Sequence, residues 1–262
     1  MKVNLITFQD KAVKELRVDI ADALDSYRRR GKTQVVSLQA PTGAGKTIIA
    51  ASLIEDIYFG STLADGTTFD EQPEAIFVWL SDSPELNAQS KQKIELKTSK
   101  LRFGQCVTIA EDSFDMEMLE DGHVYFLNTQ KISRSGKLTQ HSDDRQYTIW
   151  ETLDNTIQSK SDHLYFIIDE AHHCISDSYQ RVLQHFPEAH VLGVTATPDR
   201  GDMRNLGQYF ETLAYEYTLP KAIKEGYLCP IKALTIPLKI DMSSVSVQAG
   251  DFKAGDISTA LD

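Results

Sequence analysis

Residues 35–50 read VVSLQAPTGAGKTIIA: a short apolar run, a turn of small residues, and the start of a second apolar segment. Residues 34–38 predict a strand. Residues 47–58 predict a well-buried helix, because apolar side chains occupy much of its circumference. Glycines in the turn let backbone N–H groups close around a bulky anion, and the unpaired N–H groups at a helix start add positive charge. The segment therefore predicts a strand–loop–helix unit that binds phosphate groups.

The loop at residues 40–47 supplies the candidate phosphate contacts. Lys46 is placed to reach the β- and γ-phosphates of a nucleotide, and the Thr47 hydroxyl is a candidate Mg²⁺ ligand. Ala40 stands where the general pattern G-x-x-x-x-G-K-[ST] has its first glycine. A glycine-rich turn that precedes Lys-Thr by chance is the alternative. The candidate nucleotide-binding residues of the loop are Pro41, Thr42, Gly43, Ala44, Gly45, Lys46 and Thr47.

Strands and helices alternate along the rest of the chain. Residues 11–27 predict an amphipathic helix, and residues 84–100 predict a polar helix that is basic towards its end. Residues 164–168 are all apolar, as expected of a central parallel strand covered on both faces. Further strands are predicted at residues 75–80, 107–110, 124–127 and 191–194. This order predicts an α/β fold with a mostly parallel sheet and helices on both faces.

Two carboxylates follow the most apolar of the predicted strands. In doubly wound sheets ligands bind at the carboxyl ends of the strands, so Asp169 is expected beside the phosphate loop. A carboxylate there can hold Mg²⁺ directly or through water. The adjacent Glu170 can orient or deprotonate a water molecule in line with the γ-phosphate. Acidic residues are common at strand ends, so this pair alone is weak evidence for a site. Together with Lys46 and Thr47 of the phosphate loop it becomes strong evidence.

The composition is that of an ordinary globular protein. The chain has 262 residues, of which 41% are hydrophobic and 25% charged, and its net charge is −11. These values exclude a disordered, collagen-like or coiled-coil chain. No apolar run approaches the ~20 residues that span a bilayer, and the start of the sequence lacks a signal-peptide pattern, so no membrane partner is expected. Three widely spaced cysteines predict neither disulfides nor a zinc site and favour a reducing, cytoplasmic setting.

Four charged or polar stretches stand out in the sequence. Residues 60–73 and 133–145 predict loops or insertions. Between them, residues 111–121 hold six acidic residues and no basic one. A solvated face is one interpretation of this acidic run, and a decoy that mimics a nucleic-acid backbone is the other. The basic residues within 91–102 indicate either a solvated helix face or a source of attraction for nucleic acid.

Several motifs together resemble those of superfamily 2 helicases. Residues 169–172, Asp-Glu-Ala-His, resemble the DEAH box, and residues 40–47 resemble that group's phosphate loop, where alanine often replaces the first glycine. Residues 195–198, Thr-Ala-Thr-Pro, resemble the motif that couples ATP state to nucleic-acid binding. Residues 79–93 and 195–230 resemble the ATPase subunit of type III restriction enzymes and its XPB-like relatives. The resemblance covers about residues 5–235 and implies a P-loop NTPase, RecA-like fold.

The resemblance implies roles for the matching residues. ATP and Mg²⁺ are the implied cofactors, with Lys46, Asp169 and Glu170 catalytic and with Thr47 and Asp169 as metal ligands. Gln9 is implied to read adenine, although a glutamine on a helix-capping turn is the alternative. The residues implied to contact nucleic acid or to couple it to ATP are Ser81, Asn128, Thr129, His172, Thr195 and Thr197. For His172, a polar residue that covers a strand end is the alternative.

The resemblance also implies a part that this sequence does not show. Superfamily 2 motors have two RecA-like lobes, and the second supplies an arginine to the γ-phosphate; nothing after Thr197 resembles that arginine motif. We expect residues 1–230 to form one ATP-binding lobe. Residues 231–262, with a strand-like run at 231–240, are expected to lead to a second lobe. The isolated chain is then expected to hydrolyse ATP weakly. The other expected partners are nucleic acid, DNA rather than RNA, and a methyltransferase or specificity subunit.

Three other functions stay open from the sequence. The first is a P-loop ATPase that does not act on nucleic acid, and the position of residues 195–198 after the acidic pair argues against it. The second is a restriction endonuclease subunit. Residues 95–97, Glu-Leu-Lys, match half of a nuclease site with Asp82 upstream, but that site needs strands and this segment predicts a helix. The third is a non-catalytic scaffold, which the intact phosphate loop and acidic pair disfavour.

Overall fold

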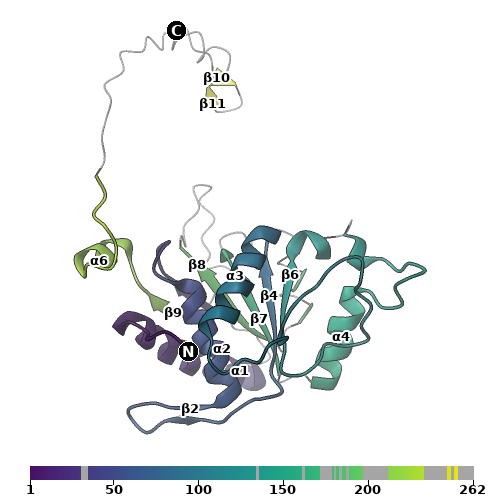
Figure 1. Cartoon of the computed structure of the whole chain (residues 1–262), viewed down its shortest axis with the longest axis horizontal. Coiled ribbons are helices and arrows are strands. Elements are labelled where there is room, and N and C mark those ends of the chain that lie inside the picture. The colour runs from purple at the N-terminus through teal and green to yellow at the C-terminus, as the bar shows by residue number, and fades with distance from the viewer. Residues whose placement is uncertain are drawn as a thin grey trace. The chain divides into compact units, whose positions relative to one another are not determined.

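The computed structural model describes residues 1–30, 35–133, 136–160, 163–171, 179, 181–182, 185–186, 189–196, 212–232, 247–248 and 251–252. The chain forms two compact units, Met1–Leu228 and Cys229–Asp262. The second unit contains a short antiparallel pair of strands, β10 (Val247–Gln248) and β11 (Asp251–Phe252) (Figure 1). A search of the described helices finds none with the length and apolar character needed to cross a membrane.

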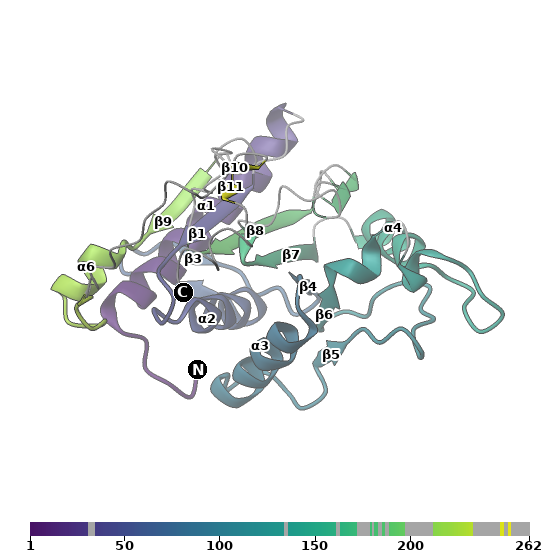
Figure 2. The same ribbon diagram turned by 90° about the horizontal axis from the view of Figure 1, so that it is seen from above.

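A seven-stranded parallel sheet forms the centre of the first unit, in the order β5-β6-β4-β7-β8-β1-β9 (Figure 2). In chain order its strands are β1 (Val36–Gln39), β4 (Ile76–Ser81), β5 (Cys106–Thr108), β6 (Val124–Asn128), β7 (Leu164–Asp169), β8 (His190–Thr195) and β9 (Thr212–Glu216). The central strands β4, β6 and β8 are buried along their whole length. A strand covered on both faces is stable only with apolar side chains on both, which explains the continuous apolar runs in the sequence.

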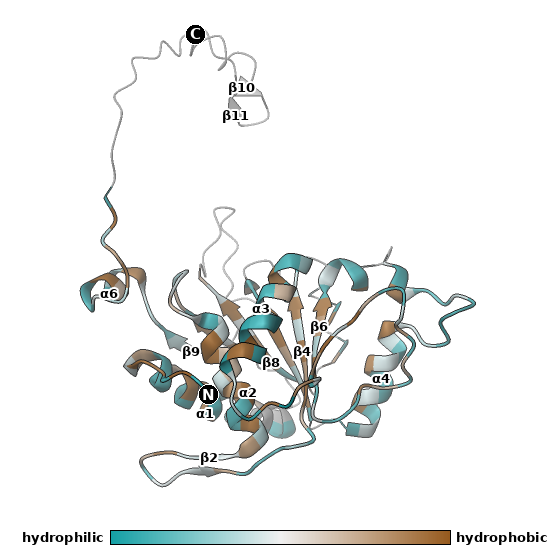
Figure 3. Ribbon diagram, viewed as in Figure 1, coloured by the Kyte–Doolittle hydropathy of each residue, from teal (hydrophilic) through white to brown (hydrophobic). Residues whose placement is uncertain are grey.

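Two hydrophobic cores lie on opposite faces of the sheet, because successive residues of a strand point to opposite sides. Phe77 and Trp79 of β4 belong to the core that includes α1 (Thr7–Arg30), α2 (Lys46–Phe59) and α3 (Pro84–Lys97). Val78 and Leu80 belong to the core that includes α4 (Ile149–Lys160). Figure 2 shows α2 and α3 on one side of the sheet and α4 on the other. In Figure 3 the central strands are coloured hydrophobic along most of their length, whereas α3 and α4 carry hydrophilic patches.

Shorter elements connect these layers. β2 (Ser61–Thr62) and β3 (Thr68–Phe69) pair as a small antiparallel hairpin. Two 3₁₀ turns, η1 (Thr129–Ile132) and η2 (Lys137–Thr139), follow β6, and the short helix α6 (Leu219–Lys224) follows β9. Residues 140–148 connect η2 to α4 (Ile149–Lys160).

The predicted fold class is confirmed, and several predicted boundaries are wrong. The helix predicted at residues 84–100 ends at Lys97, because Thr98 is extended and its hydroxyl bonds the carbonyl of Ile94. The strand predicted at 107–110 is β5, and the loop predicted at 60–73 contains the hairpin of β2 and β3. Ile231 and Lys232 form no strand, contrary to the run predicted at 231–240, whose remainder lies outside the described residues. Sequence patterns predicted neither α4 nor β9.

Candidate active site

The loop between β1 and α2 needs glycine at two positions. Gly43 and Gly45 have φ values of 87° and 85°, in the left-handed region that only glycine adopts freely. A Cβ on Gly45 would lie 2.6 Å from Nε2 of Gln9, and one on Gly43 would lie 3.2 Å from Cδ2 of Leu228. The loop is therefore closed tightly by its own turns and by α1. At its end α2 begins, and the first N–H groups of a helix lack partners within the helix.

The acidic pair lies at the carboxyl end of β7. The Asp169 carboxylate accepts hydrogen bonds from the N–H of Glu170 at 3.1 Å and from the Ser90 hydroxyl of α3 at 3.3 Å. Burial raises the pKa of Asp169 above its ordinary value, and the charge of Glu170 raises it further. The N–H of Glu170, the charge of Lys46 and the Ser90 hydroxyl act in the opposite direction. Lys46, the phosphate-loop lysine, thus contributes to the electrostatics of the acidic pair.

Glu170 has an unusual backbone conformation. Among the described residues it is the one non-glycine residue with a positive φ, 51°. This left-handed conformation costs an L-residue about 1–2 kcal/mol, and such strained residues concentrate at functional sites. The chain turns sharply directly after Asp169, so that both carboxylates stay at the same edge of the sheet.

One pocket of about 490 Å³ brings the predicted catalytic residues together. Lys46, Thr47, Asp169 and Glu170 all line it, although they come from distant parts of the sequence. From the loop and α2 it is lined by Thr42, Gly43, Gly45, Lys46, Thr47 and Ile48, and from α3 by Leu86, Gln89, Ser90, Lys93 and Lys97. Pro41 and Ala44 are buried behind the loop surface. Thr47 and Asp169 face the same space, as a shared metal ion would require.

Gln9 lies against the phosphate loop. Its side-chain oxygen accepts a hydrogen bond from the N–H of Ile6 at 3.2 Å, and its Nε2 donates to the carbonyl of Ala44 at 3.0 Å. The glutamine therefore joins the start of α1 to the phosphate loop. It caps the helix, as the alternative interpretation predicted, and it also lies against the loop that lines the pocket. Next to it, Phe8 stacks on Tyr217, with ring centroids 3.9 Å apart. Reading of adenine by Gln9 stays a prediction.

The residues predicted to meet nucleic acid lie deeper than their polar side chains suggest. Ser81 and Asn128 pair in register at the carboxyl ends of β4 and β6. Ser81 is fully buried and donates to the Ser83 carbonyl at 2.9 Å, and the Asn128 side chain accepts from the N–H of Gln130 at 2.8 Å. Thr129 and Thr195 are also buried. His172 and Thr197 lie outside the described residues, and the nucleic-acid contacts stay predictions.

The structure links the phosphate loop to the third predicted motif. The N–H of Ala40 donates to the carbonyl of Thr195 at 3.0 Å, at the ends of the paired strands β1 and β8. A backbone hydrogen bond therefore joins the start of the loop to the end of β8. This contact is between backbone groups, so no side-chain pattern in the sequence could have indicated it.

The pocket-lining residues of α3 were not predicted as part of this site. Lys93 and Lys97 belong to the basic stretch whose interpretation was left open between a solvated face and attraction of nucleic acid. Both line the pocket, whereas Lys91 forms an ion pair with Glu95 at 4.0 Å. Glu95 and Lys97, the proposed half of a nuclease site, lie on this helix and not on strands.

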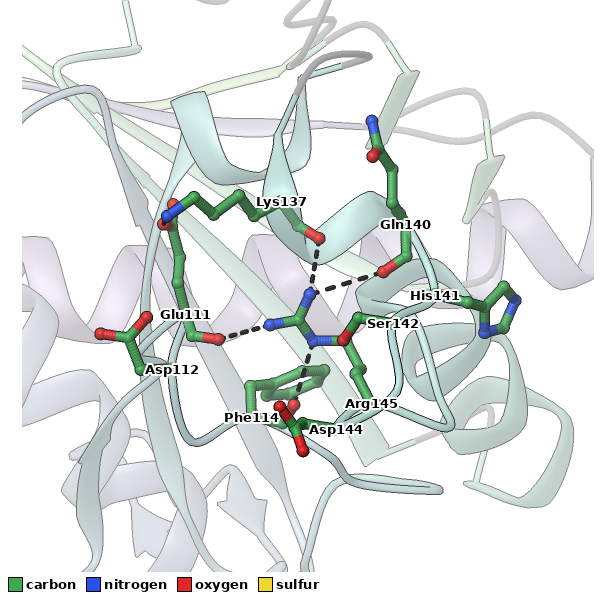
Figure 4. A pocket seen from close by; sticks show the side chains of 9 residues that line it. All are labelled: Glu111, Asp112, Phe114, Lys137, Gln140, His141, Ser142, Asp144 and Arg145. Atoms are coloured by element: carbon green, nitrogen blue, oxygen red, sulfur yellow. Dashed lines mark hydrogen bonds and ion pairs between the residues drawn. The ribbon is translucent and has the colours of Figure 1, made fainter.

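A second pocket lies away from the predicted site residues and surrounds Arg145 (Figure 4). The Arg145 guanidinium donates to the carbonyls of Phe114 at 3.1 Å, Lys137 at 2.6 Å and Gln140 at 3.4 Å, and to that of Glu111. Arg145 thereby ties the acidic run to the loop that follows η2. Because its donors are used by backbone carbonyls, we assign it a structural role.

Comparisons with known proteins agree with this geometry. The sequence model of the family described as "Type III restriction enzyme, res subunit" matches residues 2–200. The chain is 25% identical over 259 residues to the "Putative ATP-dependent helicase IRC3" of Saccharomyces cerevisiae, covering 95% of this chain and 33% of the relative. It is 32% identical over 79 residues to the "Type I restriction enzyme EcoAI endonuclease subunit" of Escherichia coli, covering 29% of this chain and 10% of the relative.

A solved structure shares the fold. A nuclease-deletion mutant of the Type ISP restriction-modification enzyme LlaGI, in complex with a DNA substrate mimic, matches with a TM-score of 0.53 at 14% identity, covering 85% of this chain and 20% of that chain. The chain spans about a third or less of the length of each of these three proteins.

Proposed function

This chain belongs to the family of the type III restriction enzyme res subunit, and on that premise we propose that it binds and hydrolyses MgATP as one lobe of a nucleic-acid-dependent motor. The observation that carries the proposal is the pocket in which Lys46, Thr47, Asp169 and Glu170 converge. P-loop ATPases hydrolyse ATP with a phosphate-binding loop, a carboxylate that binds the metal ion and a residue that orients the attacking water.

Each residue has a task that follows from its place. Lys46 and the N–H groups of the loop bind the β- and γ-phosphates, since the helix start and the lysine both present positive charge to the pocket. Asp169 and Thr47 hold the metal ion. Glu170 accepts a hydrogen bond from the attacking water and orients it. The strained backbone of Glu170 keeps its carboxylate beside Asp169.

The donors fit Mg²⁺. This ion is usually bound by one or two carboxylates together with substrate phosphates, and Asp169 with the Thr47 hydroxyl supplies such a set of oxygens. The pKa of Asp169 is raised by burial and by Glu170, so the ionised carboxylate is destabilised in the absence of a cation. Bound Mg²⁺ would neutralise charge on the phosphates and carboxylates.

The whole protein's partners form part of the proposal. The DNA substrate mimic bound to the LlaGI mutant supports DNA over RNA. The relatives' greater length supports a second RecA-like lobe that supplies an arginine, with residues 1–230 as the present lobe and 231–262 as the path towards the next. The two restriction relatives support a methyltransferase or specificity subunit. The spacing of the three cysteines supports a cytoplasmic location.

Calorimetric titration of the chain with MgATP tests the nucleotide site. We expect saturable binding that Lys46→Ala weakens by at least about tenfold, because a charge-assisted hydrogen bond of about 1.5 kcal/mol or more is lost. Lys100→Ala removes the same charge from an exposed residue that lies outside the pocket and is the matched control. Binding that is equal in the parent and Lys46→Ala would refute the site.

A separate measurement tests the nucleic-acid part. DNA and RNA duplexes and single strands are titrated into the chain, with and without MgATP, at two salt concentrations. We expect DNA to bind, more weakly at higher salt because phosphate contacts release counterions. MgATP binding without any measurable DNA or RNA binding would favour an ATPase that does not act on nucleic acid.

A further inference from the structure

The candidate nucleotide pocket has a second wall, formed by one face of α3. The α3 residues that line the pocket are Leu86, Gln89, Ser90, Lys93 and Lys97. Their spacing of three or four residues places them on one side of a helix. The wall is therefore one side of the helix, and it presents two lysines to the same space as Lys46.

At the start of α3, the Ser83 hydroxyl caps the helix by accepting a hydrogen bond from the N–H of Leu86 at 3.3 Å. Two contacts with the rest of the fold then fix the rotation of α3 about its axis. In its middle, the Ser90 hydroxyl donates to Asp169 at 3.3 Å. Near its end, Ile94 is fully buried in the core shared with α2. Since Ser90 touches the acidic pair, Lys93 lies one turn further along the same face and Lys97 a turn beyond it.

Neither lysine has an anionic partner among the residues that the structure describes. Within the described part of the chain, no carboxylate lies within 4.0 Å of the ammonium group of Lys93 or Lys97. The other lysines of the basic stretch are engaged elsewhere: Lys91 pairs with Glu95, and Lys100 lies 4.9 Å from the centre of the Phe59 ring. Two unpaired cations facing a pocket of this kind match a polyanionic ligand.

We propose that Lys93 and Lys97 bind the phosphates of the nucleotide from the α3 side, opposite the phosphate loop. This inference rests on the proposed function, because it assigns two further ligand-binding residues to the same site. Lys93 is adjacent to Ser90 and acts on the terminal phosphate. Lys97 adds longer-range attraction. The pair favours a triphosphate over a diphosphate, because an added phosphate brings more negative charge to these cations.

Calorimetry of single and double variants tests the pair, with MgATP and MgADP as probes. We expect Lys93→Ala to weaken MgATP binding about tenfold and the double variant with Lys97→Ala by more, with a smaller effect on MgADP. Lys93→Arg should restore most of the affinity, because it keeps the charge. Lys100→Ala is the control of equal charge change on the same basic stretch. Thermal unfolding of each variant shows whether it folds like the parent.

Three outcomes of these binding measurements would contradict the proposed role of Lys93 and Lys97. If the double variant binds MgATP as tightly as the parent while Lys46→Ala has lost binding, the nucleotide site stands and the role of the two lysines is refuted. If Lys46→Ala also binds normally, both the proposed function and this inference fail. If the double variant loses DNA binding and keeps MgATP binding, the lysines serve nucleic acid, which also overturns the inference.

Discussion

Arg145 offers the sharpest test of how the loops of this fold are held. Its guanidinium donates to four backbone carbonyls, those of Glu111, Phe114, Lys137 and Gln140 (Figure 4). Arg145→Ala would leave these acceptors without their charged donor. A hydrogen bond from a charged group contributes about 1.5–3 kcal/mol, but Arg145 is only partly buried and water can rehydrate several carbonyls. We therefore expect a total loss of about 2–3 kcal/mol, well below the sum of four such bonds.

Urea and thermal unfolding measure this loss. For a unit of this size, a change of about 2–3 kcal/mol lowers Tm by about 5–10 °C. Arg145→Lys should recover less than half of it, because one ammonium group cannot span four carbonyls. Lys137→Ala is the matched control: it keeps the Lys137 carbonyl and removes only an exposed ion pair to Glu111 at 3.7 Å, expected to contribute about 0.5 kcal/mol or less. If Arg145→Ala unfolds within about 0.5 kcal/mol of the parent, this account of Arg145 is wrong.

Three further predictions concern the candidate active site. Gly45→Ala should weaken MgATP binding at least about tenfold in calorimetry, because its Cβ would lie 2.6 Å from Gln9 at a φ of 85°. Gly66→Ala, at a φ of 91° with nothing within 4 Å, should leave that affinity unchanged. The free energy of unfolding of Glu170→Gly should exceed that of Glu170→Ala by about 0.5–1 kcal/mol. Glycine relieves the left-handed strain, but part of this gain is lost because glycine makes the unfolded chain more flexible. Equal urea midpoints for the two variants would show that the backbone at this position is not strained. Asp169→Asn should stabilise the Mg²⁺-free chain near pH 7. The folded pKa of Asp169 is raised, so its ionisation costs stability above that pKa, and the gain should disappear as the pH falls below the ordinary value of 3.8. A gain of equal size at all pH values, measured by thermal unfolding, would contradict this explanation.

The local parts of the site could be predicted from the sequence. The phosphate loop is one continuous segment whose glycines and following lysine have a direct physical purpose, and the structure gives Gly43 and Gly45 the positive φ values that such a turn needs. Asp169 and Glu170 lie at the end of a strand whose continuous apolar run predicts a central position in the sheet. Parallel strands bring their carboxyl ends to one edge, so the convergence of the two segments followed from the fold class.

Other parts depended on contacts that a sequence does not display. Ser81 and Asn128, which the resemblance implied as nucleic-acid contacts, are buried, and the Ser81 hydroxyl and the Asn128 side-chain oxygen each form a local hydrogen bond. Their contact with nucleic acid stays a prediction. The edge strand β9 has five residues, of which Tyr215 alone is buried, so its sequence carries no clear period-two pattern. Likewise, the acidic run was open between a solvated face and a mimic of a nucleic-acid backbone, and neither interpretation included its link to Arg145. That link involves carbonyl groups, which every residue carries.

The distribution of charge decides what a net charge of −11 means for this molecule. Charges more than about 8 Å away are largely screened at physiological ionic strength, so an anion in the pocket responds mainly to the groups that line it. There Lys46, Lys93 and Lys97 stand against Asp169 and Glu170. The basic stretch of α3 was ambiguous because helical spacing shows which residues share a face but not what that face meets. The contact of Ser90 with Asp169 supplies the missing information: it turns that face, and the two lysines on it, towards the site where a polyphosphate would lie.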